Sequence, residues 1–468
     1  MIKCSRYLYM GRMGMKSLIG DKKFYRMVLI VCIPIVIQNG FTNLASLLDN
    51  VMIGQLGTLS MSGVSISNQL FQVFNVSVFG AMSGAGIFLA QFYGRGNRDG
   101  VHNCFRIKML LGILISILAI CIFKILGPSL ITLYLNDNPT DSLTTLNYGM
   151  QYMNVMLIGL IPFAITQVFS SSLRETGNTV LPMKASVIAV IVNFCINYIL
   201  IFGNFGFPRL GVIGAAIGTV VSRIVEMGIN MAAGYNNEYL KDAMHLNKVS
   251  GDIFVNVVKR GTPLLCNEIL WSISIALISQ CYSTRGLAAV AAINITTTVT
   301  NFFMIICYAM GNSISIIVGQ RLGAGEIEYA KDCDLKMVFM NFMMCLCIGV
   351  ALFGCSSIIP QIYNTSVEVR SLATSLLRVS ACMLPIISLY YSSYFTMRAG
   401  GKTLLTFFFD SGYTFMFTFM VALCLTRFTN LPIFNVYLLV QCVDIPKAIL
   451  GITLVKKGIW VHNIVNEL

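Results

Sequence analysis

Long apolar segments recur along the whole chain, and they constrain the fold more than any other feature. A membrane-spanning helix needs about 20 apolar residues, and the chain has twelve segments of that length. They lie near residues 27–53, 59–90, 106–127, 146–171, 181–203, 210–234, 254–282, 287–318, 336–359, 372–396, 403–426 and 431–455. Only 11% of the residues are charged, against about a quarter in soluble proteins. The sequence therefore predicts an all-α integral membrane protein with twelve transmembrane helices.

Basic residues concentrate in alternate connections between these segments. One set of connections is rich in lysine and arginine, including Arg95 and Lys331, whereas the opposite set holds few, such as Lys124 and Arg209. Cytoplasmic loops of membrane proteins carry this excess of positive charge. We therefore expect a multi-pass protein of the cell membrane with both termini in the cytoplasm. The net charge of +13 does not indicate nucleic-acid binding, because the basic residues form no single patch.

The two halves of the chain resemble each other. AQFYGRGN at 90–97 and GQRLGAGE at 319–326 share the pattern Q-x-x-G-x-G, and the same offset pairs Pro34 with Pro263. Each half has six spans, so we expect two pseudo-symmetric lobes related by an axis along the membrane normal, with a cavity between them. The predicted parts are a basic cytoplasmic tail (1–26), an N-terminal lobe (27–235), a cytoplasmic linker (236–252), a C-terminal lobe (253–456) and a cytoplasmic tail (457–468).

Polar side chains recur on one face of several predicted helices. In the second span they occur at spacings of three and four residues, and the repeat pairs three of them with polar residues of the eighth span. The residues of these faces are Ser65, Asn68, Gln72 and Asn75, then Asn294, Thr297 and Asn301, and, in the first span, Asn39, Thr42, Asn43, Ser46 and Asp49. Such residues either form hydrogen bonds between helices or line a cavity. Their matched positions in the two halves favour the cavity.

Two acidic residues lie within predicted spans. Glu268 falls near the bilayer centre, about a dozen residues into its helix at 1.5 Å per residue, and no lysine or arginine lies one turn away on that helix. A charge at this depth is costly and indicates a functional site. Asp49 lies nearer the external end of its span, so a position at the water interface would also explain it. Trp271, one turn from Glu268, either contacts a bound cation or packs between helices.

Other charged and reactive residues suggest structural roles. Arg223 with Glu226, and Asp444 with Lys447, have the spacing of ion pairs within one helix, and Asp410 is a weaker candidate for function. The fifteen cysteines show neither the spacing of a metal site nor that of a disulfide framework. The sequence shows neither a cluster of carboxylates nor a paired nucleophile and base, so it does not indicate an intramembrane enzyme. We therefore expect neither a metal nor a cofactor.

Several of these segments together resemble the multidrug and toxic compound extrusion (MATE) transporters. They are LLDNVMIGQLG in the first span, Q-x-x-G-x-G after the second and eighth spans, NEILWS in the seventh, and R-x-x-G-N-T followed by VNFCINYILIFGNFGFPRLGVIGAA (192–216). The resemblance covers residues 26–456. It implies two six-helix lobes and alternating access. It also implies export of amphipathic organic cations in exchange for protons or sodium.

The resemblance assigns the family's acidic residues of the first and seventh spans to Asp49 and Glu268. One branch has an N-x-x-x-D pattern in the fifth span, which appears here as Asn193 and Asn197, so an amide replaces that branch's carboxylate. The acid that another branch has in the tenth span is absent from ACMLPIISLYYSSYF (381–395). We interpret Glu268 and Asp49 as ion-coupling residues and the polar faces, with Asn193, Asn197 and Trp271, as cavity residues.

Other functions remain open at this point. A flippase or exporter of a lipid-linked or other polar substrate belongs to the same superfamily, but it would favour a basic cavity, and the lone charge at mid-depth here is acidic. A channel would favour a ring of helices over a twofold repeat. We expect the partners to be small organic cations and membrane lipids, and the protein to be a monomer.

The charge distribution predicts the side of each connection. Cysteines introduced near residues 95, 245 and 330 should react with a membrane-impermeant thiol reagent only from the cytoplasm, because these connections carry the basic residues. Cysteines near residues 137 and 365 should react from outside. Labelling of any one of these positions on the opposite side would contradict the arrangement of six spans per lobe.

Overall fold

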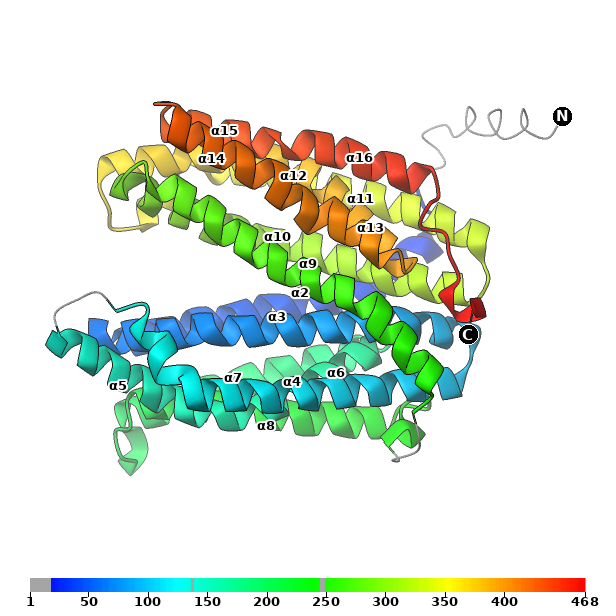
Figure 1. The fold of residues 1–468 in the computed structure, drawn as a ribbon, viewed down its shortest axis with the longest axis horizontal. Helices are drawn as coiled ribbons and strands as arrows, with labels where there is room; N and C mark the ends of the chain where they lie inside the picture. Colours follow the sequence, from blue (N-terminus) through cyan, green and yellow to red (C-terminus); the bar gives the residue numbers. More distant parts are fainter. Residues whose placement is uncertain (1–17, 136–138, 245–248, 468) are drawn as a thin grey trace. The chain divides into compact units, whose positions relative to one another are not determined.

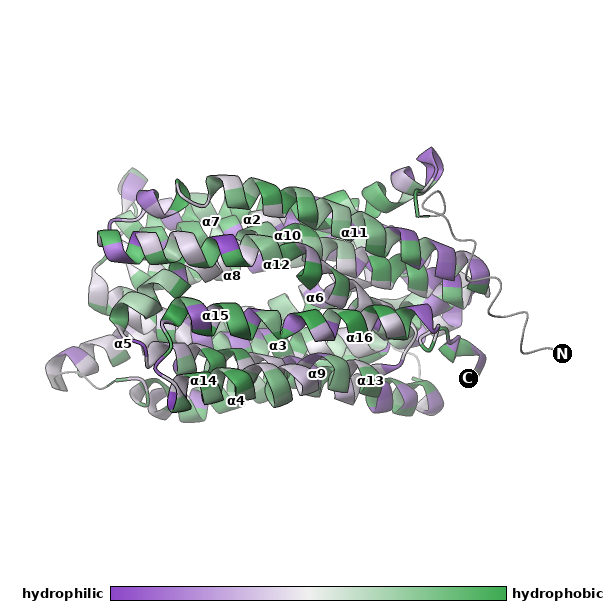
Figure 2. Ribbon diagram, turned by 90° about the horizontal axis from the view of Figure 1, so that it is seen from above, coloured by the Kyte–Doolittle hydropathy of each residue, from purple (hydrophilic) through white to green (hydrophobic). Residues whose placement is uncertain are grey.

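The computed structural model describes residues 18–135, 139–244 and 249–467. Within these ranges, twelve helical segments are long and apolar enough to cross a membrane, which confirms the predicted number of spans. Residues 1–17 and 468 of the predicted tails, and residues 245–248 of the predicted linker, lie outside the described residues. Figure 2 shows apolar residues along the lengths of the helices and hydrophilic residues gathered at many of their ends, as expected for helices that cross a bilayer.

Most of the spans described are single helices, labelled in Figure 1. These are α2 (Lys22–Gly54), α3 (Thr58–Arg95), α4 (Arg98–Thr132), α7 (Val180–Phe202), α8 (Val212–Tyr235), α9 (Gly251–Ser283), α10 (Leu287–Gly323), α11 (Ile327–Cys355) and α12 (Val367–Ala399). The others are each composed of two helices, namely α5 (Pro139–Met156) with α6 (Leu160–Glu175), α13 (Thr403–Phe407) with α14 (Met420–Phe428), and α15 (Ile433–Cys442) with α16 (Asp444–Lys456).

The interruptions have local causes in two of these composite spans. Proline lacks a backbone N–H and cannot bond to the carbonyl four residues earlier. Pro162 therefore leaves the carbonyl of Ile158 without its helical partner, and a 3-10 turn, Leu157–Gly159, separates α5 from α6. Pro446 likewise leaves the carbonyl of Cys442 without its helical partner, and Cys442 is the last residue of α15. The third span holds two π-helical turns, Phe408–Gly412 and Thr414–Phe419, which contain no proline and which the sequence did not predict.

Glycines paired by the sequence repeat adopt matching conformations. Gly57 and Gly286 precede α3 and α10 with φ of 115° and 100°, and Gly96 and Gly325 follow the same two helices with φ of 74° and 79°. These are left-handed values that residues with a Cβ rarely adopt. The repeat is therefore present in the backbone as well as in the sequence.

The described residues form two compact packing units. One unit runs from Pro34 to Ile269, and the other combines the residues before Pro34 with Leu270–Glu467. The unit boundaries fall inside α2 and α9, whereas the predicted lobes meet in the connection at 236–252. In the Pro34–Ile269 unit, α3 packs against α4 and α5, and α7 packs against α8; in the other unit, α12 packs against α10, α11 and α16.

Small residues allow α3 and α5 to approach closely. A Cβ added to Gly63 on α3 would lie 2.6 Å from the carbonyl oxygen of Thr145 and 2.8 Å from the backbone nitrogen of Gly149 on α5. Ser67, one turn along α3, donates a hydrogen bond to the carbonyl of Gly149 at 3.1 Å. Close backbone approach at small residues is a common means of helix association in membranes.

This contact generates a stability prediction. Gly63→Val should lower the thermal unfolding temperature of the detergent-purified protein by several degrees, because overpacking at a tight contact costs about 1–3 kcal/mol. Gly228→Val on α8 is the matched control, since a Cβ there meets nothing within 4 Å and the change in helix propensity is the same. Equal destabilisation by the two variants would show that the α3–α5 contact is not tight.

Candidate functional site

Asp49 on α2 forms a hydrogen bond to α7. The side-chain amide nitrogen of Asn197 donates to Oδ1 of Asp49 at 2.6 Å. Asn197 is completely buried and Asp49 is half-buried, so the carboxylate reaches into the packed interior of the Pro34–Ile269 unit. A hydrogen bond to a charged group contributes about 1.5–3 kcal/mol. A position in interfacial water therefore does not account for Asp49.

The hydrogen bonds continue from Asp49 into α8. Asn197 also donates to Oδ1 of Asn193 at 3.3 Å, and Asn193 donates to the hydroxyl of Thr219 on α8 at 3.4 Å. The spacing of four residues places both asparagines on one face of α7. A Cβ on Gly218 would lie 2.0 Å from Oδ1 of Asn197, so the absence of a side chain there allows α8 to approach. We call Asp49, Asn197, Asn193 and Thr219 the Asp49 chain.

The predicted polar faces of α3 and α10 are accessible at several positions. Asn68 and Gln72 on α3, and Asn294 and Asn301 on α10, are exposed. Asn68 accepts a hydrogen bond from the buried hydroxyl of Tyr152 at 3.3 Å. This bond joins α3 to α5, so Asn68 takes part in hydrogen bonding between helices although its side chain is exposed. The exposure of these four side chains is consistent with the cavity interpretation, which stays a prediction.

The remaining predicted residues lie elsewhere. Thr42 and Asn43 are exposed on α2 and Asn39 is half-buried. Glu268 is half-buried on α9, beside the buried Asn267, and it is not a member of the Asp49 chain. Trp271 is half-buried and, with Asn294 and Asn301, belongs to the unit that contains Leu270–Glu467.

A second polar group in the Pro34–Ile269 unit was not predicted. Gln38 on α2 donates to the hydroxyl of Ser186 on α7 at 2.9 Å, and this hydroxyl donates to Oε1 of Glu226 on α8 at 2.5 Å. The group thus joins the same three helices as the Asp49 chain. Gln38 lies one turn before Thr42 on the polar face of α2, and Ser186 lies two turns before Asn193 on α7. Spacing within each helix did not show that these side chains meet.

Both ion pairs predicted within single helices are wrong. In the described residues, Arg223 forms no ion pair with Glu226; its guanidinium lies over the ring of Phe163 at 4.9 Å. The ammonium of Lys447 is 2.9 Å from Oδ1 of Asp410 rather than paired with Asp444. Spacing along one helix identifies neighbours on that helix only, whereas helix packing supplies these closer partners.

The chemistry of the Asp49 chain suits a cation. Asp49 offers carboxylate oxygens, Asn193 and Asn197 offer amide groups, and Thr219 offers a hydroxyl. Such a set can accept a proton or bind a monovalent cation at Asp49. Among the described residues, no group of three or more histidine, cysteine, aspartate or glutamate side chains is arranged to hold a metal ion.

Comparison with known proteins places this chain in a family. A sequence model of the family described as MatE matches residues 34–199 and 263–423, which together make up more than half of the chain. This chain belongs to the MatE family. The two matched regions begin at Pro34 and Pro263, the prolines that the internal repeat pairs.

Similar proteins carry names of multidrug resistance proteins. A probable multidrug resistance protein NorM of Thermotoga maritima is 25% identical over 378 residues, 80% of each chain. The multidrug resistance protein MdtK of Pectobacterium atrosepticum is 22% identical over 355 residues, 75% of this chain and 76% of its own. A solved outward-facing MATE transporter of the MOP superfamily has a TM-score of 0.85 at 18% identity, covering 96% of this chain and 98% of its own. A MOP superfamily transporter from Pyrococcus furiosus has a TM-score of 0.83 at the same identity and the same two coverages.

The hydrogen bond between Asn197 and Asp49 in this MatE transporter allows a prediction about the pH dependence of transport. Asn197→Asp would place a second carboxyl group at hydrogen-bonding distance from Asp49. Two carboxyl groups this close cannot both ionise freely. They therefore share one proton over part of the pH range. We therefore expect the pH profile of transport to gain a titration step that the wild-type profile lacks.

Asn154→Asp provides the control for this experiment. Asn154 is exposed on α5 and contacts Lys124, so its replacement adds the same charge away from the Asp49 chain. This variant should keep the wild-type pH profile. An unchanged profile in Asn197→Asp would place Asn197 outside the coupling site.

Proposed function

We propose that this MatE transporter exports amphipathic organic cations in exchange for protons or sodium ions. The observation that carries the proposal is the Asp49 chain, a carboxylate held by buried amides within a membrane span. The names of the multidrug resistance proteins above support drug or toxic-compound export. We place the transporter in the cell membrane, as a monomer with both termini in the cytoplasm.

The proposed attraction for a cation is electrostatic. A carboxylate in a region of low effective dielectric attracts an organic cation more strongly than it would in water. Exposed polar residues such as Asn68 and Gln72 can form hydrogen bonds with polar parts of the substrate. Aromatic side chains, of which Trp271 is a candidate, can stack on its rings or contact its charge.

Antiport follows if the coupling ion and the substrate exclude each other. A proton or a sodium ion bound at a carboxylate cancels the charge that attracts the organic cation, so binding of one favours release of the other. We assign the principal coupling role to Glu268, because it lies at mid-depth in its span, and a second role to Asp49. Neither role requires a cofactor.

Export of a lipid-linked or other polar substrate is the second candidate function. The transporter from Pyrococcus furiosus is described as having a binding pocket of reverse polarity, with a different function suggested. Pockets on this fold therefore differ in charge. A pyrophosphate-containing substrate would need basic groups, whereas the Asp49 chain contributes an acid and amides. The geometry thus favours a cation.

Replacing the two carboxylates by amides tests the proposed function. Glu268→Gln should reduce gradient-driven uptake of a fluorescent organic cation into proteoliposomes by about tenfold or more, the scale of ordinary coupling energies. Asp49→Asn should reduce it less, or for some substrates only. Proton and sodium gradients imposed separately identify the coupling ion.

The exposed Asp141 of α5 provides a matched control, since Asp141→Asn also removes one negative charge. This variant should transport like the wild-type protein. Full export by a well-inserted Glu268→Gln variant would defeat the coupling mechanism. Full export by both amide variants would leave Asp49 with a structural role alone.

A further inference from the structure

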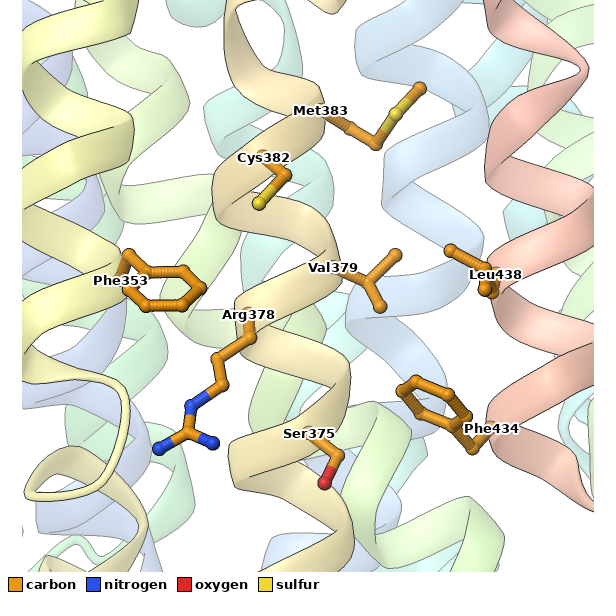
Figure 3. A pocket seen from close by; sticks show the side chains of 8 residues that line it. All are labelled: Phe353, Ser375, Arg378, Val379, Cys382, Met383, Phe434 and Leu438. Carbon is orange, nitrogen blue, oxygen red and sulfur yellow. The ribbon is translucent and has the colours of Figure 1, made fainter.

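A groove runs along α12 between α11 and α15, all within the unit that contains Leu270–Glu467. Its volume is about 310 Å³. Figure 3 shows Phe353 of α11 on one side, Phe434 and Leu438 of α15 on the other, and Val379 and Met383 of α12 between them. We call this the α12 groove. Its walls are apolar along most of its length.

The α12 groove opens toward lipid. Four large apolar side chains of α11 are exposed at spacings of three and four residues, namely Met343, Leu346, Val350 and Phe353. This spacing gives one exposed apolar face of a helix, which in a membrane protein contacts acyl chains. Phe353 is the last member of this face and also forms a wall of the groove. The groove is therefore continuous with the surface that meets the bilayer.

One end of the groove carries a positive charge. The guanidinium of Arg378 donates to the hydroxyl of Ser356 at 3.3 Å and to that of Ser357 at 3.0 Å, and it lies 5.7 Å from the ring of Phe353. Arg378 is exposed, and no acidic side chain among the described residues forms an ion pair with it. An unpaired charge on a lipid-facing surface is costly unless it reaches the headgroup region.

The position of Arg378 along the membrane indicates which headgroups it meets. Ser356 and Ser357 directly follow the end of α11 at Cys355, in the connection that the charge distribution places outside the cytoplasm. Basic residues are scarce on that side of the predicted topology. Arg378 therefore lies at the level of the extracytoplasmic headgroups, with hydroxyl groups beside it and an apolar groove leading toward the bilayer interior.

We propose that the α12 groove binds one anionic phospholipid of the extracytoplasmic leaflet. The Arg378 guanidinium binds the phosphate through two parallel N–H donors, a geometry that suits arginine better than lysine. Ser356 is buried and only orients the guanidinium, whereas the exposed hydroxyl of Ser357 binds the polar headgroup. One acyl chain lies over Val379 and Met383. The positive charge repels organic cations, so the groove is not a second site for the proposed substrate.

The headgroup decides the selectivity of this site. Acyl chains are as apolar as the groove, so moving a chain from the bilayer into it brings little hydrophobic gain. The phosphate contact therefore supplies the selectivity. A zwitterionic lipid carries its own positive group, which competes with the guanidinium. The site should prefer phosphatidylglycerol to phosphatidylcholine.

Native mass spectrometry of the purified full-length protein tests the proposal. Wild-type protein titrated with palmitoyl-oleoyl phosphatidylglycerol should bind one lipid more tightly than the corresponding phosphatidylcholine. Arg378→Gln should weaken phosphatidylglycerol binding about fivefold, the contribution of a single basic residue near an anionic headgroup. Arg378→Lys should bind with intermediate affinity, because it keeps the charge but loses the two-donor geometry.

Two further variants separate this site from general attraction of anionic lipid. Arg209→Gln removes an exposed arginine from another connection on the same predicted side, and its lipid binding should stay at the wild-type level. Cys382→Trp fills the groove at an exposed lining position without changing the charge, and it should weaken phosphatidylglycerol binding. Equal binding by wild type and Arg378→Gln, equal loss in Arg209→Gln, or unchanged binding in Cys382→Trp would each overturn the proposal.

Discussion

The structure depends on one constraint, which is that lipid offers no hydrogen-bond partners to polar groups in the spans. The protein supplies those partners itself. The completely buried ammonium of Lys108 lies 2.5 Å from a carboxylate oxygen of Glu175. Lys447 is held by Asp410 and by the hydroxyl of Thr414, with the ring of Tyr390 4.5 Å away. Asp49 satisfies the same requirement through the amide of a neighbouring helix, and like Glu175 and Asp410 it is half-buried.

Features that depend on local sequence could be predicted. The twelve spans follow from the length of apolar segments, and the paired glycines follow from the repeat because each must adopt a left-handed conformation at a helix end. The interruptions at Pro162 and Pro446 could not be predicted from proline alone, because other prolines lie within continuous helices, namely Pro34, Pro128, Pro263 and Pro385. The π-helical turns around Asp410 could not be predicted, because no residue type marks them. The packing units differ from the predicted lobes because their boundaries fall inside α2 and α9. The repeat does not define the paths of these two helices.

The candidate site was partly predictable for a related reason. Spacing placed Asn193 and Asn197 on one face of α7, and position within a span made Asp49 a candidate. The hydrogen bond between Asp49 and Asn197 needed the packing of α2 against α7, which spacing within a helix does not contain. The group formed by Gln38, Ser186 and Glu226 was missed for this reason. The spacing of Gln38 from Thr42, and of Ser186 from Asn193, identifies a face of one helix but not the partner that another helix brings to it.

In the proposed mechanism an organic cation competes with a coupling ion for a membrane carboxylate. Equilibrium binding of tetraphenylphosphonium to the purified transporter, measured over a series of pH values and sodium concentrations, tests for this competition. We expect the apparent affinity to fall as the concentration of one of the two ions rises. We expect this dependence to disappear when Asp49 and Glu268 are both replaced by amides. An affinity independent of both ions in the wild-type protein would exclude the competition.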